Sequence, residues 1–260
     1  MTTRYIDGLA VEVEGSGDAV VCIHGLGGTS NTWTPLLRAM RNNTIIRIDL
    51  PGSGRSSSVI GELTIARMAE AVISVCQQLD VSVAHFVGHS MGSIVCQYVA
   101  AKKASLVKTM TLFGPLACPP DVARPNIVAR AEKAASGGAI AMQEIADAIV
   151  NGTLAASTKD ALPVVVTMVR ESLMRQDAHG YSKSCMALSQ VLSAALEDIT
   201  APTLLITGDE DPVAPPSTVN EMGRRMPNSR VVILNKCGHW TPVERPSECI
   251  GFIEESLRRR

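Results

Sequence analysis

Residues 84–102 read AHFVGHSMGSIVCQYVAAK, and this stretch joins a strand pattern to a helix pattern through one short turn. The letters AHFV are typical of a buried strand, and SIVCQYVAAK is typical of a helix. Between them, residues 88–92 (GHSMG) match the pattern G-x-S-x-G. In this context the pattern predicts a tight turn that holds Ser90 in a strained backbone conformation and projects its hydroxyl above a sheet. An incidental serine in a glycine-rich turn is the alternative that the motif alone leaves open.

Short apolar runs and helical patterns alternate on both sides of this stretch. Strands are predicted at residues 19–23, 44–48, 83–87, 106–113, 203–207 and 230–234, and helices near 31–40, 64–79, 91–102, 216–226 and 246–257. Strands that are buried on both faces and separated by helices indicate a parallel sheet wrapped by helices. Segments 4–7 and 9–14 flank Asp7-Gly8, which is a hairpin signal, so they are expected to add antiparallel strands at one edge.

This alternation stops between residues 117 and 199, where the pattern is helical and no strand is convincing. We therefore predict a core domain from residues 1–116 and 200–260 with a helical cap inserted at 117–199. The expected helix breaks in the cap are Gly137-Gly138, Asn151-Gly152 and His179-Gly180.

The composition and the first residues of the chain indicate which binding partners and which cellular compartment to expect. The chain has 260 residues with a formal net charge of −1, so we expect no nucleic-acid partner and no attachment to an anionic membrane surface. No apolar stretch approaches the roughly 20 residues that span a bilayer. The start, MTTRYIDGLAVEVEG, lacks the features of a signal peptide. The seven cysteines are scattered without a CxxC spacing, so no zinc or other metal is expected, and the predicted location is the cytoplasm.

A serine hydroxyl is a weak nucleophile and needs a general base within hydrogen-bond reach. Of the five histidines, His24 and His89 lie inside glycine motifs, where shaping a loop is the expected role. His85 enters a strand, and His179 lies in the predicted cap. His239 follows a late strand and Gly238, in a loop that can reach over the sheet edge, so it is the candidate base.

The base in turn needs a carboxylate that fixes its tautomer and stabilises the imidazolium. Residues 208–213 (GDEDPV) follow the strand TLLIT and offer Asp209, Glu210 and Asp211. Asp211 is the candidate because it lies past the turn, whereas Asp209 is expected to hold the turn and Glu210 to be solvated. The order Ser90, Asp211, His239 is the order that hydrolases with a nucleophile elbow use. The three residues are expected to meet beyond the carboxyl ends of the strands.

A glycine-rich loop, HGLGG at residues 24–28, follows the strand AVVCI. Glycines let the backbone approach a reacting carbonyl, so the backbone N–H groups of Leu26 and Met91 are the candidate oxyanion hole. One such donor contributes about 3 kcal/mol in the transition state. The competing interpretation is a phosphate-binding loop, but neither G-x-G-x-x-G nor G-x-x-x-x-G-K-[ST] is present in this loop, and no cofactor is expected.

With these motifs in order, the chain resembles the α/β-hydrolase superfamily over nearly its whole length. The segments that carry the resemblance are HGLGG (24–28), DLPGSGRS (49–56), GHSMG (88–92), GDED (208–211) and GHW (238–240). The resemblance implies an eight-stranded, mostly parallel α/β sheet with a helical cap after the sixth strand. It also implies that Ser90, Asp211 and His239 form a catalytic triad. Within the superfamily, HGLGGTSNTW and DLPGSGRSS look most similar to 3-oxoadipate enol-lactonases and small carboxylesterases.

The expected function is therefore hydrolysis of a small carboxylic ester or lactone through an acyl-enzyme. The alternatives are a non-catalytic or single-turnover receptor on the same fold, a cofactor-free haloperoxidase or perhydrolase, and a C–C bond hydrolase. The substrate pocket is expected to be lined by Leu26, Trp33, Met91 and Trp240 together with cap residues. An acidic lactone would need a cation in the cap, and the candidates are Arg124, Arg130, Lys133, Arg170 and Arg175.

Overall fold

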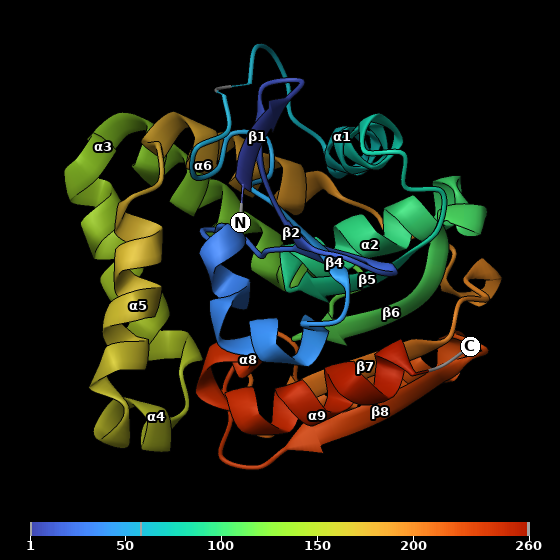
Figure 1. Cartoon of the computed structure of the whole chain (residues 1–260). Coiled ribbons are helices and arrows are strands. Elements are labelled where there is room, and N and C mark those ends of the chain that lie inside the picture. Colours follow the sequence, from blue (N-terminus) through green and yellow to red (C-terminus); the bar gives the residue numbers. More distant parts are fainter. Residues whose placement is uncertain (1, 58, 259–260) are drawn as a thin grey trace.

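The computed structural model describes residues 2–57 and 59–258, in which eight strands form one sheet (Figure 1). In chain order the strands are β1 (Thr2–Ile6), β2 (Leu9–Gly15), β3 (Ala19–Ile23), β4 (Thr44–Ile48), β5 (Ala84–His89), β6 (Val107–Phe113), β7 (Thr203–Gly208) and β8 (Ser229–Leu234). Their spatial order is β1-β2-β4-β3-β5-β6-β7-β8. The pairs β1–β2 and β2–β4 are antiparallel, and all the other pairs are parallel. The eight-stranded, mostly parallel α/β fold and its edge hairpin are therefore confirmed.

Helices cover both faces of this sheet. The longer ones are η1 (Ser30–Met40), α1 (Ile65–Gln78), α2 (Met91–Lys102), α3 (Arg124–Thr153), α5 (Pro163–Met174), α6 (Ala178–Gln190), α7 (Pro216–Arg225) and α9 (Pro246–Leu257), and the short ones include α4 (Ala156–Ala161) and α8 (Thr241–Glu244). Buried side chains of η1 and α9, such as Leu36 and Ile253, form one core cluster with the sheet. Those of α1 and α2, such as Val72 and Val95, belong to a second cluster that also includes side chains of the inserted helices.

The helix predicted at residues 31–40 is a series of 3₁₀ turns instead of an α-helix. Pro35 lies inside it and has no N–H to donate, so it cannot support a regular α-helical hydrogen-bond pattern. Thr29 caps its start by accepting a hydrogen bond from the Asn31 N–H. The segment still covers the sheet, because its apolar side chains face the core.

The helical insertion follows β6, as predicted, and consists mainly of α3, α4, α5 and α6 (Figure 1). In the figure these helices lie to one side of the sheet, at the end where β6 and β8 finish. The break at Gly138 is found, because its φ of 57° and ψ of −138° kink α3. The other two breaks lie beside the predicted positions: α3 ends at Thr153, just after Asn151-Gly152, and α6 begins at Ala178, so His179-Gly180 lies in its first turn.

The glycine at position 180 has a different use. Asp177 caps α6 by accepting a hydrogen bond from the Gly180 N–H at 2.8 Å. A Cβ added at Gly180 would lie 2.1 Å from the carbonyl oxygen of Gly52. The glycine therefore lets the insertion approach a core loop closely.

Helices able to cross a bilayer, judged by their length and hydropathy, are not found among residues 2–57 and 59–258.

Candidate active site

The turn between β5 and α2 holds Ser90 at φ 51° and ψ −121°, a backbone conformation that L-residues rarely adopt. Its N–H donates to the carbonyl of Phe113 at 2.9 Å, which ties the turn to β6. A Cβ added at Gly92 would lie 2.2 Å from the carbonyl oxygen of Ile23, and one at Gly88 would lie 2.9 Å from that of Gly92. Both glycines of the G-x-S-x-G pattern are therefore required for the close approach of strand and helix.

The structure brings Ser90, His239 and Asp211 into one hydrogen-bonded line. His239 Nε2 lies 2.8 Å from Ser90 Oγ, and His239 Nδ1 lies 2.9 Å from Asp211 Oδ2. All three side chains are buried, and they come from the loops that follow β5, β7 and β8. With Nδ1 protonated and bonded to Asp211, Nε2 is free to accept the serine proton, which is the arrangement that general-base catalysis requires.

The Asp211 carboxylate is held by several donors besides the histidine. Its Oδ1 accepts hydrogen bonds from the N–H groups of Val213 and Ala214, each at 2.8 Å. Burial raises the pKa of Asp211, but His239 and these amide donors outweigh burial and bring the pKa down to about 2. Asp211 is therefore ionised at neutral pH, as the partner of an imidazolium must be.

The other two acids considered in this turn face elsewhere. Asp209 Oδ1 accepts a hydrogen bond from the Cys237 N–H at 3.1 Å, and Glu210 Oε2 accepts one from the Ala156 N–H at 3.0 Å. Asp209 thus holds the turn, while Glu210 links the turn to the insertion.

The N–H groups of Leu26 and Met91 have no acceptor among residues 2–57 and 59–258. Met91 is the first residue of α2, where backbone N–H groups have no partner within the helix. A Cβ added at Gly25 would lie 3.0 Å from Ser90 Cβ, so the loop that carries Leu26 passes directly beside the serine. This geometry leaves two donors available to an oxyanion next to Ser90.

His24 and His89 act as fixed neutral hydrogen-bond partners in these loops. His24 Nδ1 lies 2.7 Å from the Gly25 carbonyl, and its Nε2 accepts a hydrogen bond from the Leu50 N–H at 2.9 Å. His89 Nε2 lies 2.9 Å from the carbonyl of His239, so its N–H holds the backbone of the candidate base. Burial lowers the pKa of His89 to about 3.

We expect the protein to lose stability as the pH falls below about 6.5, the ordinary pKa of histidine. Burial lowers the pKa of His85 to about 4 and that of His89 to about 3. Between these values and 6.5 the unfolded chain binds protons that the folded chain does not, so unfolding becomes easier as the pH falls. In that window, each histidine should lower the free energy of unfolding by about 1.4 kcal/mol for every unit by which the pH falls.

Urea unfolding at several pH values between 7 and 4.5 measures this slope. His85 bonds Thr109 in the core and is remote from Ser90 in the fold, so His85→Gln should make the slope smaller without affecting the candidate active site. A free energy of unfolding that stays constant over this range, or a variant with the wild-type slope, would contradict the prediction.

Glu244 is a positioning residue that the sequence analysis missed. Its Oε1 accepts a hydrogen bond from the Trp240 N–H at 3.0 Å. Its Oε2 accepts from the Ala155 N–H at 2.9 Å, the Thr158 hydroxyl at 2.7 Å and the Gly238 N–H at 3.2 Å. The buried carboxylate thus holds both sides of His239 and ties that loop to the insertion. The only signal in the sequence was one acid in an otherwise apolar stretch, WTPVE.

A cavity of about 280 Å³ opens onto Ser90 and His239. Leu26 and Trp240 line it from the core side, and the Trp240 indole N–H donates to the Thr153 hydroxyl at 3.1 Å. The insertion contributes mainly apolar side chains, namely Ile127, Ile149 and Leu188.

Two residues expected in this pocket are not there. Trp33 is fully buried in the core cluster on the face covered by η1 and α9, with its ring centroid 6.3 Å from that of Phe113. The prediction that it lines the pocket is wrong, because the apolar side of η1 turns toward the sheet and not toward the insertion. The side chain of Met91 is likewise buried in the core, although its backbone borders the site.

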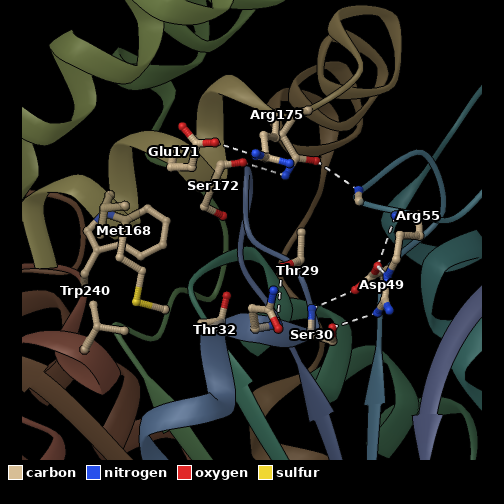
Figure 2. Close-up of a pocket in the computed structure, with 15 residues that line it drawn as sticks. Thr29, Ser30, Thr32, Asp49, Arg55, Met168, Glu171, Ser172, Arg175 and Trp240 are labelled. Carbon is tan, nitrogen blue, oxygen red and sulfur yellow. Dashed lines mark hydrogen bonds and ion pairs between the residues drawn. The ribbon is translucent and has the colours of Figure 1, made fainter. Parts of the chain in front are cut away.

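A larger cavity of about 630 Å³ lies between α5 and the loops at residues 29–32 and 49–55 (Figure 2). Figure 2 shows Trp240 on its wall, and Trp240 lines the smaller cavity as well. The charges around the larger cavity are paired: Arg55 with Asp49 at 2.9 Å, and Arg175 with Glu171. It is not lined by Ser90, His239 or Asp211. The candidate active site is therefore at the smaller cavity, which Ser90 and His239 line.

Within residues 2–57 and 59–258, no group of three or more histidine, cysteine, aspartate and glutamate side chains could hold a metal ion.

Comparison with known proteins gives a consistent set of relatives. The family model described as alpha/beta hydrolase fold matches residues 18–246. 3-Oxoadipate enol-lactonase 1 of Acinetobacter baylyi is 25% identical over 266 residues, which cover 98% of this chain and 96% of that protein. A thermophilic esterase from Thermogutta terrifontis has a TM-score of 0.91 and 26% identity, covering 96% of this chain and 93% of the other. The enol-lactonase from Burkholderia xenovorans LB400 has a TM-score of 0.88 and 25% identity, with coverages of 98% and 99%.

Proposed function

The chain belongs to the alpha/beta hydrolase family, and we propose on this premise that it is a serine hydrolase that cleaves a small carboxylic ester or lactone. One observation carries the proposal. Ser90 Oγ lies 2.8 Å from His239 Nε2, and the other nitrogen of that ring, Nδ1, lies 2.9 Å from the buried carboxylate of Asp211. Such a chain of contacts makes an alcohol nucleophilic at neutral pH.

In the proposed reaction, Ser90 Oγ attacks the carbonyl carbon while His239 Nε2 takes the hydroxyl proton. The oxyanion that forms accepts hydrogen bonds from the N–H groups of Leu26 and Met91. His239 then gives its proton to the leaving alkoxide, which departs as the alcohol, or as the opened hydroxyl end of a lactone. A water molecule, deprotonated by His239, attacks the acyl-enzyme and releases the carboxylic acid with Ser90 restored.

The substrate class rests on two further observations. The relatives that align with nearly the whole chain include an esterase and enol-lactonases. The cavity at Ser90 has a volume of about 280 Å³, which suits a compact acyl group.

The test is a panel of p-nitrophenyl esters of rising acyl length and of simple lactones, combined with labelling by a fluorophosphonate probe. We expect turnover that is highest for short acyl groups, and labelling of a single serine that peptide mapping identifies as Ser90. Absence of both turnover and labelling in folded protein would refute the proposal.

The alternative functions would give different results in the same experiments. A receptor on this fold would react once and retain the product, so the release of p-nitrophenol would stop at one equivalent per protein. A haloperoxidase or perhydrolase would show peroxide-dependent halogenation faster than ester cleavage. A C–C bond hydrolase would cleave a diketone in preference to every ester on the panel.

A further inference from the structure

The five arginine and lysine residues named above as candidates to bind an acidic substrate differ in whether they already pair with an acid. Four of them already pair with acids: Arg124 with Asp121 at 3.0 Å, Lys133 with Glu144 at 2.8 Å, Arg170 with Asp147 at 2.5 Å, and Arg175 with Glu171. The fifth, Arg130, lies on α3 and lines the same cavity as Ser90 and His239. It is the one lysine or arginine among the residues lining that cavity.

Arg130 has no acid partner in the part of the chain that the structure describes. Its Nε atom is buried and has no hydrogen-bond acceptor within residues 2–57 and 59–258. The groups that interact with it are the Tyr181 hydroxyl and the Cys185 thiol. Burial raises the pKa of both Tyr181 and Cys185, so both are neutral at pH 7 and neither balances the positive charge.

A partly buried cation without an anion is unfavourable unless something supplies the missing charge. The remaining insertion residues at the cavity are mostly apolar, so they cannot supply it. A guanidinium is planar and matches the two oxygens of a carboxylate. With only one cation in a small cavity, a singly charged carboxylate fits better than a doubly charged phosphate.

We propose that Arg130 binds a free carboxylate on the acyl group of the substrate. The substrate class is then a half-ester of a short dicarboxylic acid, or a lactone that carries a carboxylate. This inference rests on the proposed hydrolase activity. The carboxylate is placed on the acyl side because the acyl group stays bonded to Ser90 in the cavity while the alcohol departs.

The first test compares two esters of about the same length, mono-p-nitrophenyl glutarate and p-nitrophenyl hexanoate. The wild-type protein should have at least about a 10-fold higher kcat/KM for the glutarate, and Arg130→Met should lose about 30-fold on the glutarate alone, as expected for a charge-assisted hydrogen bond. Arg130→Lys keeps the charge and should retain part of the preference. Lys133→Met, which removes a cation one turn along α3, should change neither rate.

The second test measures binding without turnover. In a Ser90→Ala background, calorimetric titration with mono-p-nitrophenyl glutarate should give a dissociation constant that Arg130→Met raises about 30-fold. This measurement separates the two proposals. If the wild type cleaves no ester but the glutarate binds through Arg130, the hydrolase proposal fails and the carboxylate site stands.

Thermal unfolding checks for a purely structural role. Replacing an unpaired, partly buried cation with methionine should leave Tm unchanged or raise it. A preference of the wild type for the hexanoate, equal losses of Arg130→Met on both esters, or glutarate binding that Arg130→Met leaves unchanged would overturn the inference.

Discussion

Ser90→Ala is expected to lower kcat for ester hydrolysis by about 10⁵-fold or more, since the nucleophile and base of a triad act as one unit. The variant lacks the oxygen that lies 2.8 Å from His239 Nε2, and among residues 2–57 and 59–258 no other hydroxyl forms a hydrogen bond with that nitrogen. The measurement is the initial rate with the best ester of the panel, in an assay sensitive enough to detect about 10⁻⁵ of the wild-type rate. Labelling by the fluorophosphonate should disappear in parallel.

Loss of activity through unfolding has to be excluded for this variant. Alanine at position 90 keeps the same strained backbone and removes one hydroxyl, so Tm should stay within a few degrees of the wild-type value. Ser184→Ala is a matched control, because Ser184 is a buried serine of the insertion and its hydroxyl has no partner among residues 2–57 and 59–258. The control should keep full activity. A Ser90→Ala protein that retains a tenth of the wild-type rate would end the assignment of the nucleophile.

Asp211→Asn should lower kcat by about 10⁴-fold, the effect of losing the carboxylate that fixes the tautomer of a catalytic histidine. Asparagine has one oxygen where Asp211 uses two. Oδ1 accepts from Val213 and Ala214, and Oδ2 faces His239 Nδ1. The amide therefore directs its NH₂ group toward His239, which then must accept at Nδ1 and carry its proton on Nε2, facing the serine.

The pH dependence of this loss is a further check. Asp211 has a pKa lowered to about 2, so the wild-type carboxylate is ionised throughout the usual assay range. The ratio of wild-type to variant rates should therefore not be changed by titration of Asp211 between pH 5 and 8. Asp209→Asn is the control, because Asp209 bonds the Cys237 N–H and does not contact His239. If Asp209→Asn loses far more activity than Asp211→Asn, Asp209 is the orienting acid.

Local patterns predicted much of the fold. Apolar runs of five to eight residues, each followed by a turn, located the strands, because burial on both faces demands continuous apolar sequence. The 3₁₀ character of residues 30–40 was missed, although Pro35 was visible, because an apolar helical period does not distinguish the two helix types. The role of Gly180 was not predicted, since its close approach to Gly52 depends on a residue far away in the chain.

The sequence by itself determined the fold class and the identity of Ser90, Asp211 and His239 as candidates. Turn residues and the order of the motifs can be recognised in the sequence without knowing how distant segments pack. Only the tertiary structure decided what surrounds them. It put Trp33 in the core, Glu244 behind the histidine loop, and Arg130 in the cavity without an acid partner among the described residues. Burial and ion pairing depend on which distant segments pack together, and the same arginine or tryptophan in the sequence is compatible with either outcome until that packing is known.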